Sequence, residues 1–126
     1  MRAVPARKRR FTWVKSFHPA PRSFDGCGGK FGGKSTAPAG NTPPNAFGIT
    51  DRHGNVQEWV NDWYEEYYYF ESPPVDRSGP ARGVLKVARG GCWGMNSGDC
   101  RSTARRPYPP DTHSDTIGFR VVMIES

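Results

Sequence analysis

The stretch GITDRHGNVQEWVNDWY (residues 48–64) places an Asp and a Glu within eight residues, beside a glycine and several large aromatic residues. Asp51 and Glu58 offer hard oxygen ligands that could hold a cation, and Gly54 between them would permit a tight bend. By residue type alone, the stretch could instead form a carbohydrate- or peptide-binding face, or an amphipathic helix. It is a candidate site whose chemistry depends on the elements around it.

The cysteines form the second group of reactive side chains. Cys27, Cys92 and Cys100 lack the CxxC spacing of common metal sites, and an odd number argues against a disulfide-stapled secreted scaffold. A reduced, cytoplasmic setting is expected, although Cys92 and Cys100 are close enough in sequence to meet across a loop. The histidines show no HxH or HxxxH grouping, so they add no metal signal.

The elements that position these groups are expected to be short and joined by long loops. Only 35% of the 126 residues are hydrophobic, while 15 are Gly and 12 are Pro. This balance is typical of a single, loop-rich domain. Residues 25–45 hold six of the glycines and three of the prolines without any periodic apolar pattern, which predicts an irregular loop.

Three segments carry a strand signal. Residues 56–63 fit a helical stripe or a strand, and their aromatic and β-branched content favours an extended segment. Residues 84–93 alternate in polarity and residues 116–124 are rich in β-branched side chains, so both predict strands. Residues 65–83 predict a surface loop, and residues 100–115 contain no strong element.

Positive charge is concentrated at the N-terminus. The net charge is +6, yet seven of the 18 basic residues and none of the 12 acids lie in residues 1–22. Residues 1–24 are therefore predicted to be a flexible basic arm, outside a domain formed by residues 25–126. A solubilising tail is favoured over an arm that binds phosphate, so nucleic acid is not an expected partner. No apolar run approaches the length of a membrane span.

Four runs of sequence, in order, resemble the formylglycine-generating enzyme family, also called the sulfatase-modifying factor family: PNAFGITDRHGNVQEWVNDWY, VARGGCW, CRSTARR and IGFRVV. The resemblance covers residues 25–124. It implies a loop-rich α+β domain, a variant of the C-type lectin-like fold with a small twisted antiparallel sheet. Only the C-terminal half of the family domain is matched, so a truncated, partial domain is expected. The run DGCG…TAP resembles a linker of some bacterial members, which suits a bacterial source.

The resemblance assigns a metal to residues 48–64. It implies a Ca²⁺ ion held by the side chains of Asp51 and Glu58 and by the backbone carbonyls of Gly54 and Val56. Mixed carboxylate and carbonyl oxygens suit this ion. The alternative is that both acids are solvated surface groups. Three neighbouring aromatic residues are expected to anchor the core: Trp59, Trp63 and Tyr64.

The resemblance also raises the question of copper. It implies that catalytic members bind Cu(I) through two cysteine thiolates in the loop after RGGSW, and oxidise a substrate cysteine to formylglycine. In RGGCWGMNSGDCRSTAR, Met95 stands at the first position, and the shortened loop moves Cys100 off the second when counted from RSTAR. Cys92 and Cys100 could form a displaced thiolate pair, but a small buried Cys92 is favoured. Copper is therefore not expected.

The favoured function is a non-catalytic module that binds a small ligand or a protein on its loop face. The alternatives are a copper-dependent formylglycine-generating oxidase that uses Cys92 and Cys100, and a binding protein diversified by a retroelement. Diversified proteins share this fold and vary between RGG and GFR, which gives six candidate ligand-binding residues: Trp93, Met95, Asn96, Asp99, Tyr108 and His113. A partial domain would expose a sheet edge, so a second copy or a partner chain is expected to cover it.

Overall fold

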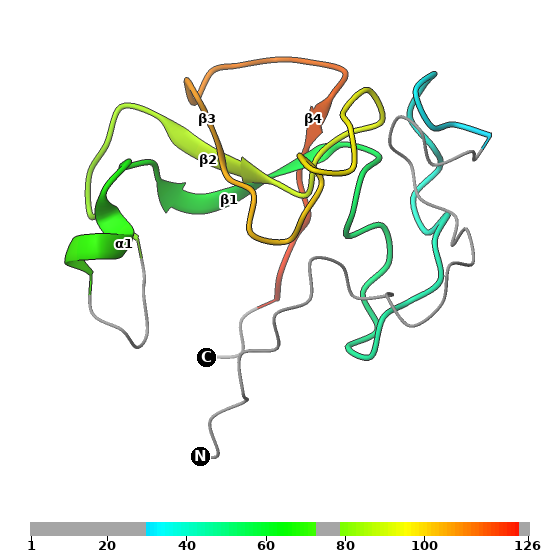
Figure 1. Cartoon of the computed structure of the whole chain (residues 1–126), viewed down its shortest axis with the longest axis horizontal. Helices are drawn as coiled ribbons and strands as arrows, with labels where there is room; N and C mark the ends of the chain where they lie inside the picture. Colours follow the sequence, from blue (N-terminus) through cyan, green and yellow to red (C-terminus); the bar gives the residue numbers. More distant parts are fainter. Residues whose placement is uncertain (1–29, 73–78, 124–126) are drawn as a thin grey trace.

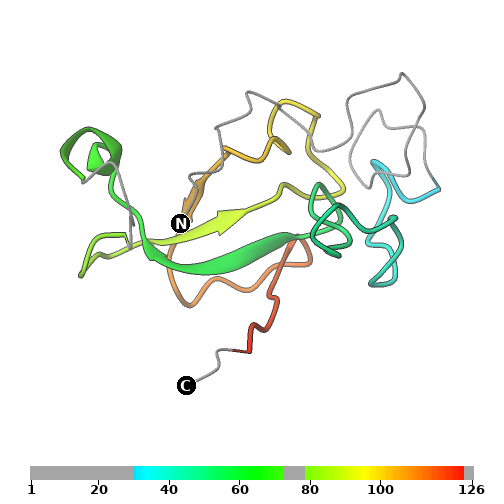
Figure 2. The same ribbon diagram turned by 90° about the horizontal axis from the view of Figure 1, so that it is seen from below.

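A computed structural model describes residues 30–72 and 79–123, and within these ranges it shows a four-stranded sheet in the order β3-β2-β1-β4. The elements are β1 (Gln57–Trp63), α1 (Tyr68–Glu71), β2 (Lys86–Arg89), β3 (Arg106–Tyr108) and β4 (Ile117–Gly118). In Figures 1 and 2, α1 lies beyond one end of β1, and the loops of residues 30–56 gather beyond the other. The predicted arm, residues 1–24, lies outside the described residues.

The ambiguous segment 56–63 forms β1, so its expected extended structure is confirmed. β1 pairs antiparallel with β2, which places Glu58 opposite Arg89 and Trp63 opposite Lys86. The Lys86 ammonium lies 4.0 Å from the centroid of the Trp63 ring. This cation–π contact covers the indole at the end of the strand pair and helps to hold the register there.

The three-residue strand β3 lies in residues 100–115, for which the sequence predicts no strong element. β3 is an edge strand beside β2, a place that tolerates Pro107 with its missing N–H. Tertiary contacts hold it. The Tyr108 hydroxyl accepts a hydrogen bond of 2.9 Å from Gln57, and its ring meets Trp59 edge-on with centroids 6.1 Å apart. These contacts compensate for a weak local preference.

The prediction of an antiparallel sheet is wrong in one respect, because β4 runs parallel to β1 and the sheet is mixed. The predicted strand 116–124 is also shorter than expected, since pairing ends at Gly118. Beyond it, the side chains of Val121, Val122 and Met123 are at least 78% exposed. In the described part of the chain no strand pairs with residues 119–123, and β-branched composition alone does not form a strand.

The core is small and lies where β1 and β2 meet the surrounding loops. Its largest fully buried side chains are Gln57, Val87 and Cys100. The three predicted aromatic anchors are partly buried: Trp59, Trp63 and Tyr64. Large aromatic side chains are seldom buried completely, and a four-stranded sheet flanked by loops offers them little enclosed space.

Loops make up most of the described chain. Residues 30–45 form turns without a helix or strand, as their Gly and Pro content predicts. The segment 65–83, predicted to be a loop, contains the single-turn helix α1. A helix of this length is too short to produce a readable apolar period in the sequence. No helix in the described ranges is long and apolar enough to cross a membrane.

Candidate functional site

The stretch predicted to hold calcium folds as a bend that leads into β1. Asp51 and Asn55 both adopt positive φ angles, 52° and 65°, and these residue types tolerate that conformation better than most. Asn55 fastens the bend, because its Oδ1 accepts a hydrogen bond from the Ala37 N–H and its Nδ2 donates to the Ala37 carbonyl. A backbone bond of 2.8 Å from Gly54 to Gly90 ties the bend to the end of β2.

Both acidic side chains that are predicted to bind calcium have protein donors. The Asp51 carboxylate accepts hydrogen bonds from the backbone N–H groups of Gly40 and Thr42. Arg120 donates to Glu58 from Nε at 3.0 Å and from Nη2 at 2.6 Å. The hydrogen bond to Glu58 is the main cause that raises the pKa of Arg120, and the negative charge of Asp51 adds to it. Arg120 thus lies within electrostatic reach of both acids.

In this arrangement, the two carboxylates among the four predicted calcium ligands have protein donors. Every carboxylate oxygen of Asp51 and Glu58 already accepts a hydrogen bond, and Arg120 supplies the positive charge at Glu58. Among the described residues, no cluster of three or more His, Cys, Asp or Glu side chains could hold a metal. Calcium binding by Asp51, Gly54, Val56 and Glu58 stays a prediction, and it requires Glu58 to exchange Arg120 for the ion.

The two cysteines predicted as catalytic lie inside the molecule as free thiols. Cys100 is 0% exposed and Cys92 is 3% exposed. Gly91, at a φ of 72°, packs so closely that a side chain there would overlap the Cys100 sulfur. Burial raises the pKa of the Cys92 thiol above its ordinary value, so the thiol stays protonated at neutral pH.

A buried histidine contacts the backbone of one of these cysteines. His53 is 6% exposed, and its Nδ1–H donates to the Cys100 carbonyl at a distance of 2.8 Å. The Cys100 sulfur lies 3.9 Å from the Cys92 carbonyl oxygen, in the geometry of a weak S–H hydrogen bond. An open Cu(I) site needs thiolates that both the metal and a substrate sulfur can reach. Two buried cysteine side chains do not fit that requirement.

The six predicted ligand-binding residues have different surroundings. Asn96 shapes a turn, since its Oδ1 accepts hydrogen bonds from the N–H groups of Gly98 and Asp99. Asp99 forms an ion pair with Arg106. Tyr108 belongs to the sheet, where it accepts a hydrogen bond from Gln57. These three side chains therefore have structural partners.

The remaining three residues have different surroundings from these. Trp93 and Met95 are half-buried on the loop that follows β2, and His113 is exposed on the connection between β3 and β4. The indole N–H of Trp93 is buried without a hydrogen-bond partner in the described part of the chain. The loop after β2 thus carries four of the six predicted residues, and the other two lie on or after β3.

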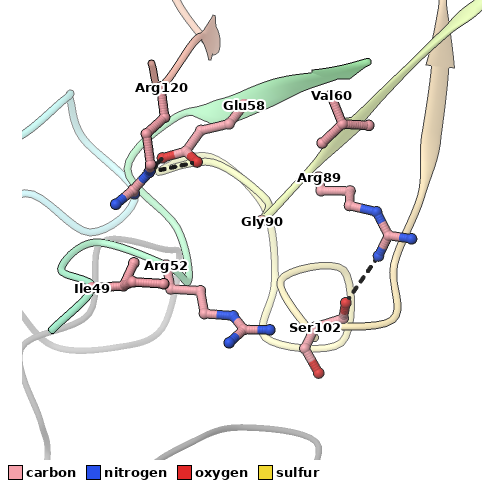
Figure 3. Close-up of a pocket in the computed structure, with 8 residues that line it drawn as sticks. All are labelled: Ile49, Arg52, Glu58, Val60, Arg89, Gly90, Ser102 and Arg120. Carbon is pink, nitrogen blue, oxygen red and sulfur yellow. Dashed lines mark hydrogen bonds and ion pairs between the residues drawn. The ribbon is translucent and has the colours of Figure 1, made fainter. Parts of the chain in front are cut away.

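A cleft of about 240 Å³ lies beside β1 and is not predicted by the sequence patterns. Figure 3 shows its eight lining residues: Ile49, Arg52, Glu58, Val60, Arg89, Gly90, Ser102 and Arg120. The sequence nevertheless contained a signal for this cleft. Three of the four runs that carry the family resemblance contribute an arginine to this cleft, and the fourth contributes Ser102.

Comparisons of sequence connect the chain to known proteins. A family model described as a sulfatase-modifying factor enzyme 1-like domain matches residues 2–124. The formylglycine-generating enzyme of Streptomyces coelicolor is 43% identical over 89 residues, which cover 68% of this chain and 28% of that protein. The serine/threonine-protein kinase pkn1 of Chlamydia caviae is 36% identical over 105 residues, which cover 82% of this chain and 17% of the kinase. The chain spans less than a third of either relative.

Comparisons of structure agree with those of sequence. The structure of PvdO from Pseudomonas aeruginosa matches with a TM-score of 0.65 and 33% identity, covering 80% of this chain and 38% of PvdO. The variable protein 1 of Treponema denticola matches with a TM-score of 0.59 and 30% identity, covering 69% of this chain and 31% of that protein. The described sheet and loops therefore correspond to a part of each of these larger folds.

Proposed function

The chain belongs to the sulfatase-modifying factor enzyme 1-like domain family, and on that premise we propose that it acts as a non-catalytic module that binds a ligand or a protein. The likeness to a Treponema denticola protein named variable protein 1 supports a binding role. We also propose that the mixed sheet and its loops are part of the C-type lectin-like fold variant that the sequence resemblance implies.

The burial of two thiols is the observation that carries this proposal. Cys92 and Cys100 are the described cysteines nearest to the positions that the family resemblance gives to copper, and both are buried. Reactive cysteines need thiolate character and access to the substrate. Burial raises the pKa of Cys92 and removes both of these conditions. The chemistry of a thiolate oxidase is therefore poorly supported here.

The competing function is a copper-dependent formylglycine-generating oxidase. Its support is the 43% identity to the formylglycine-generating enzyme of Streptomyces coelicolor. For this chain to act in that way, Cys92 and Cys100 would have to become accessible together. The close packing of Gly91 against Cys100 opposes such an opening, because buried packed groups move only with their surroundings.

The proposed binding face is the loop that follows β2. Trp93 and Met95 offer half-buried apolar surface there. Calcium is the proposed cofactor at the bend before β1. A second copy or a partner chain is proposed to cover the edge beside β4, where the described residues after Gly118 expose large apolar side chains.

Copper binding tests the proposal. The purified chain is titrated with Cu(I) in competition with a chelator of known affinity, beside a variant that combines Cys92→Ala with Cys100→Ala. We expect the two proteins to take up equally little copper, because buried thiols are poor ligands. One Cu(I) per parent chain, lost in the double variant, would establish the oxidase alternative. Cooperative thermal unfolding of the variant serves as the folding control.

A further inference from the structure

The segment that follows β4, residues 119–123, presents apolar side chains to solvent. In Figures 1 and 2 the chain leaves the sheet after β4. Four side chains of the segment are at least 77% exposed: Phe119, Val121, Val122 and Met123. Because Val121 and Val122 are adjacent and both exposed, no side of the segment packs against the described chain. An uncovered run of this kind marks a surface that binds another protein.

The backbone of the segment is also unpaired. β4 lies at one edge of the sheet, and its pairing with β1 ends at Gly118. Within residues 30–72 and 79–123, no backbone hydrogen bond involves residues 119–123. Free N–H and C=O groups on an apolar segment are a template for pairing with another chain. Phe and Val are also residue types that favour pairing between strands.

The one charged residue of the segment is neutralised within the chain. The Arg120 guanidinium donates to the Glu58 carboxylate at 2.6 Å and to the Thr50 carbonyl at 3.0 Å. These bonds anchor the start of the segment beside β1 and leave it without an unbalanced charge. Like charges that face each other destabilise a strand pair. The segment therefore offers no electrostatic obstacle to pairing with an identical copy of itself.

The charge of the remaining chain also permits self-association. Seven of the 18 basic residues and none of the 12 acids lie in residues 1–22. Residues 23–126 therefore hold 11 basic and 12 acidic side chains and are close to neutral. Repulsion between two copies of this part of the chain is small, because it grows with net charge.

A second copy supplies a complementary surface. An antiparallel pair centred on Val121 places this residue opposite itself and places Phe119 opposite Met123 of the second copy. The first contact joins two β-branched side chains, and the second brings a thioether against an aromatic ring. A two-fold axis at Val121 produces this arrangement and uses the segment of each copy once, so association ends at a dimer.

The exposed area limits the strength of the contact. Burying a Val, Phe or Met side chain removes on the order of 100 Å² of apolar surface from water, so four side chains from each copy give about 800 Å² in total. Specific stable interfaces bury more than about 1,200 Å², and smaller ones belong to transient complexes. We therefore expect a weak dimer that forms as the protein concentration rises.

From this arrangement we infer that residues 119–123 form a dimerisation segment, which pairs antiparallel with the same residues of a second copy of this chain. The inference deepens the proposed function and rests on it, because it names a second copy as the occupant of the edge beside β4. The segment is separate from the buried cysteines and from the six residues that the sequence singled out.

Sedimentation velocity of the purified chain over a range of concentrations tests this inference. We expect a monomer at low concentration and a dimer at high concentration. Val121→Lys places two ammonium groups opposite each other and removes apolar contact, so it should weaken the dimer about tenfold or more. Val84→Lys is the matched control and should leave the dimer unchanged. Val84 and Val121 are both 83% exposed, but Val84 lies before β2, outside the segment.

Hydrogen exchange distinguishes a second copy from other occupants. Protection of the amides in residues 119–123 should rise with protein concentration, because pairing requires a second chain. Equal protection at every concentration would show that another part of the same chain covers the segment, and it would overturn the inference. A chain that stays monomeric would overturn it too. So would a dimer that Val121→Lys leaves unchanged, or one that Val84→Lys weakens equally.

The proposed function fails in a different experiment. Copper uptake that depends on Cys92 and Cys100 would refute the non-catalytic role, even if the chain still forms a dimer through Val121. A chain that stays monomeric and takes up no copper would overturn the dimerisation segment alone.

Discussion

The imidazole of His53 and the backbone carbonyl of Cys100 lie 2.8 Å apart, although 47 positions separate them in the chain. His53 belongs to the bend that precedes β1, and Cys100 belongs to the loop that precedes β3. Their hydrogen bond joins two loops that the sheet does not pair. It also fixes the backbone that keeps the Cys100 thiol inside.

Replacing this histidine should destabilise the whole fold. His53→Ala leaves the buried Cys100 carbonyl without this donor and removes packed volume, so we expect a loss of about 1–3 kcal/mol in the free energy of unfolding. The exposed His113 provides the control, and His113→Ala should change stability by less than about 0.5 kcal/mol. Urea denaturation of both variants measures the difference, and equal effects would refute a structural role for His53.

The thiols should be slow to react in the folded protein. In a Cys27→Ser background, Cys92 and Cys100 are the remaining cysteines, and both are buried. A thiol-specific reagent added at neutral pH should label them only after denaturant is added, because modification requires unfolding or local opening. Rapid labelling of either thiol without denaturant, followed by mass spectrometry, would contradict the burial on which the proposed function rests.

The free energy of unfolding should fall as the pH rises above the ordinary pKa of a thiol. The folded pKa of Cys92 is raised above 9.0, so the unfolded chain loses its thiol proton first and binds fewer protons than the folded chain. The contribution of Cys92 is therefore complete below pH 9 and is lost as pH rises through the folded pKa. Denaturation midpoints at pH 8 and pH 10 should differ less in Cys92→Ala than in the parent chain. An equal pH response in both proteins would contradict the assignment.

Local residue types predicted the segments rich in β-branched and aromatic side chains and missed the strand that is held by distant contacts. The extended character of 56–63 follows from its aromatic and β-branched residues, and it forms β1. β3 depends on Tyr108 meeting Gln57 and Trp59, residues about fifty positions away. The parallel pairing of β4 and its early end at Gly118 depend on which strand lies beside it. No local preference encodes such neighbours.

The residues of the candidate site were likewise predicted only in part from the sequence. The sequence placed Asp51 and Glu58 together on one bend, but it gave no sign that Arg120 would reach across from beyond β4 to bind Glu58. The cleft was missed because Arg52, Arg89 and Arg120 come from separate segments that only the fold brings together. The family resemblance drew attention to acids and cysteines, whereas three arginines line the cleft beside β1.

Calcium and Arg120 should compete for Glu58. Arg120→Gln removes the guanidinium that now binds this carboxylate, so the variant should bind calcium more tightly than the parent chain. Calcium that binds the folded state alone stabilises it by RT ln(1 + [L]/Kd), about 2.7 kcal/mol at a hundredfold excess over Kd. Thermal unfolding with millimolar calcium or with a chelator should show a larger rise in melting temperature for the variant.

The calcium proposal has a matched control. Adding Glu58→Gln to Arg120→Gln removes the charged ligand while keeping its shape, so the gain in melting temperature should disappear. If calcium leaves the melting temperature of both the parent and Arg120→Gln unchanged, Asp51 and Glu58 do not form a calcium site in this chain. Their contacts to Gly40, Thr42 and Arg120 would then account for both acids.

The central claim, that this domain binds without catalysing, is tested most directly by peptide conversion. The purified chain is incubated with Cu(I), oxygen and a Cys-x-Pro-x-Arg peptide, and the peptide is then analysed by mass spectrometry. Because Cys92 and Cys100 are buried, we predict that the peptide cysteine remains unconverted. Formation of formylglycine in the peptide by the parent chain, and its loss in Cys100→Ser, would contradict the account.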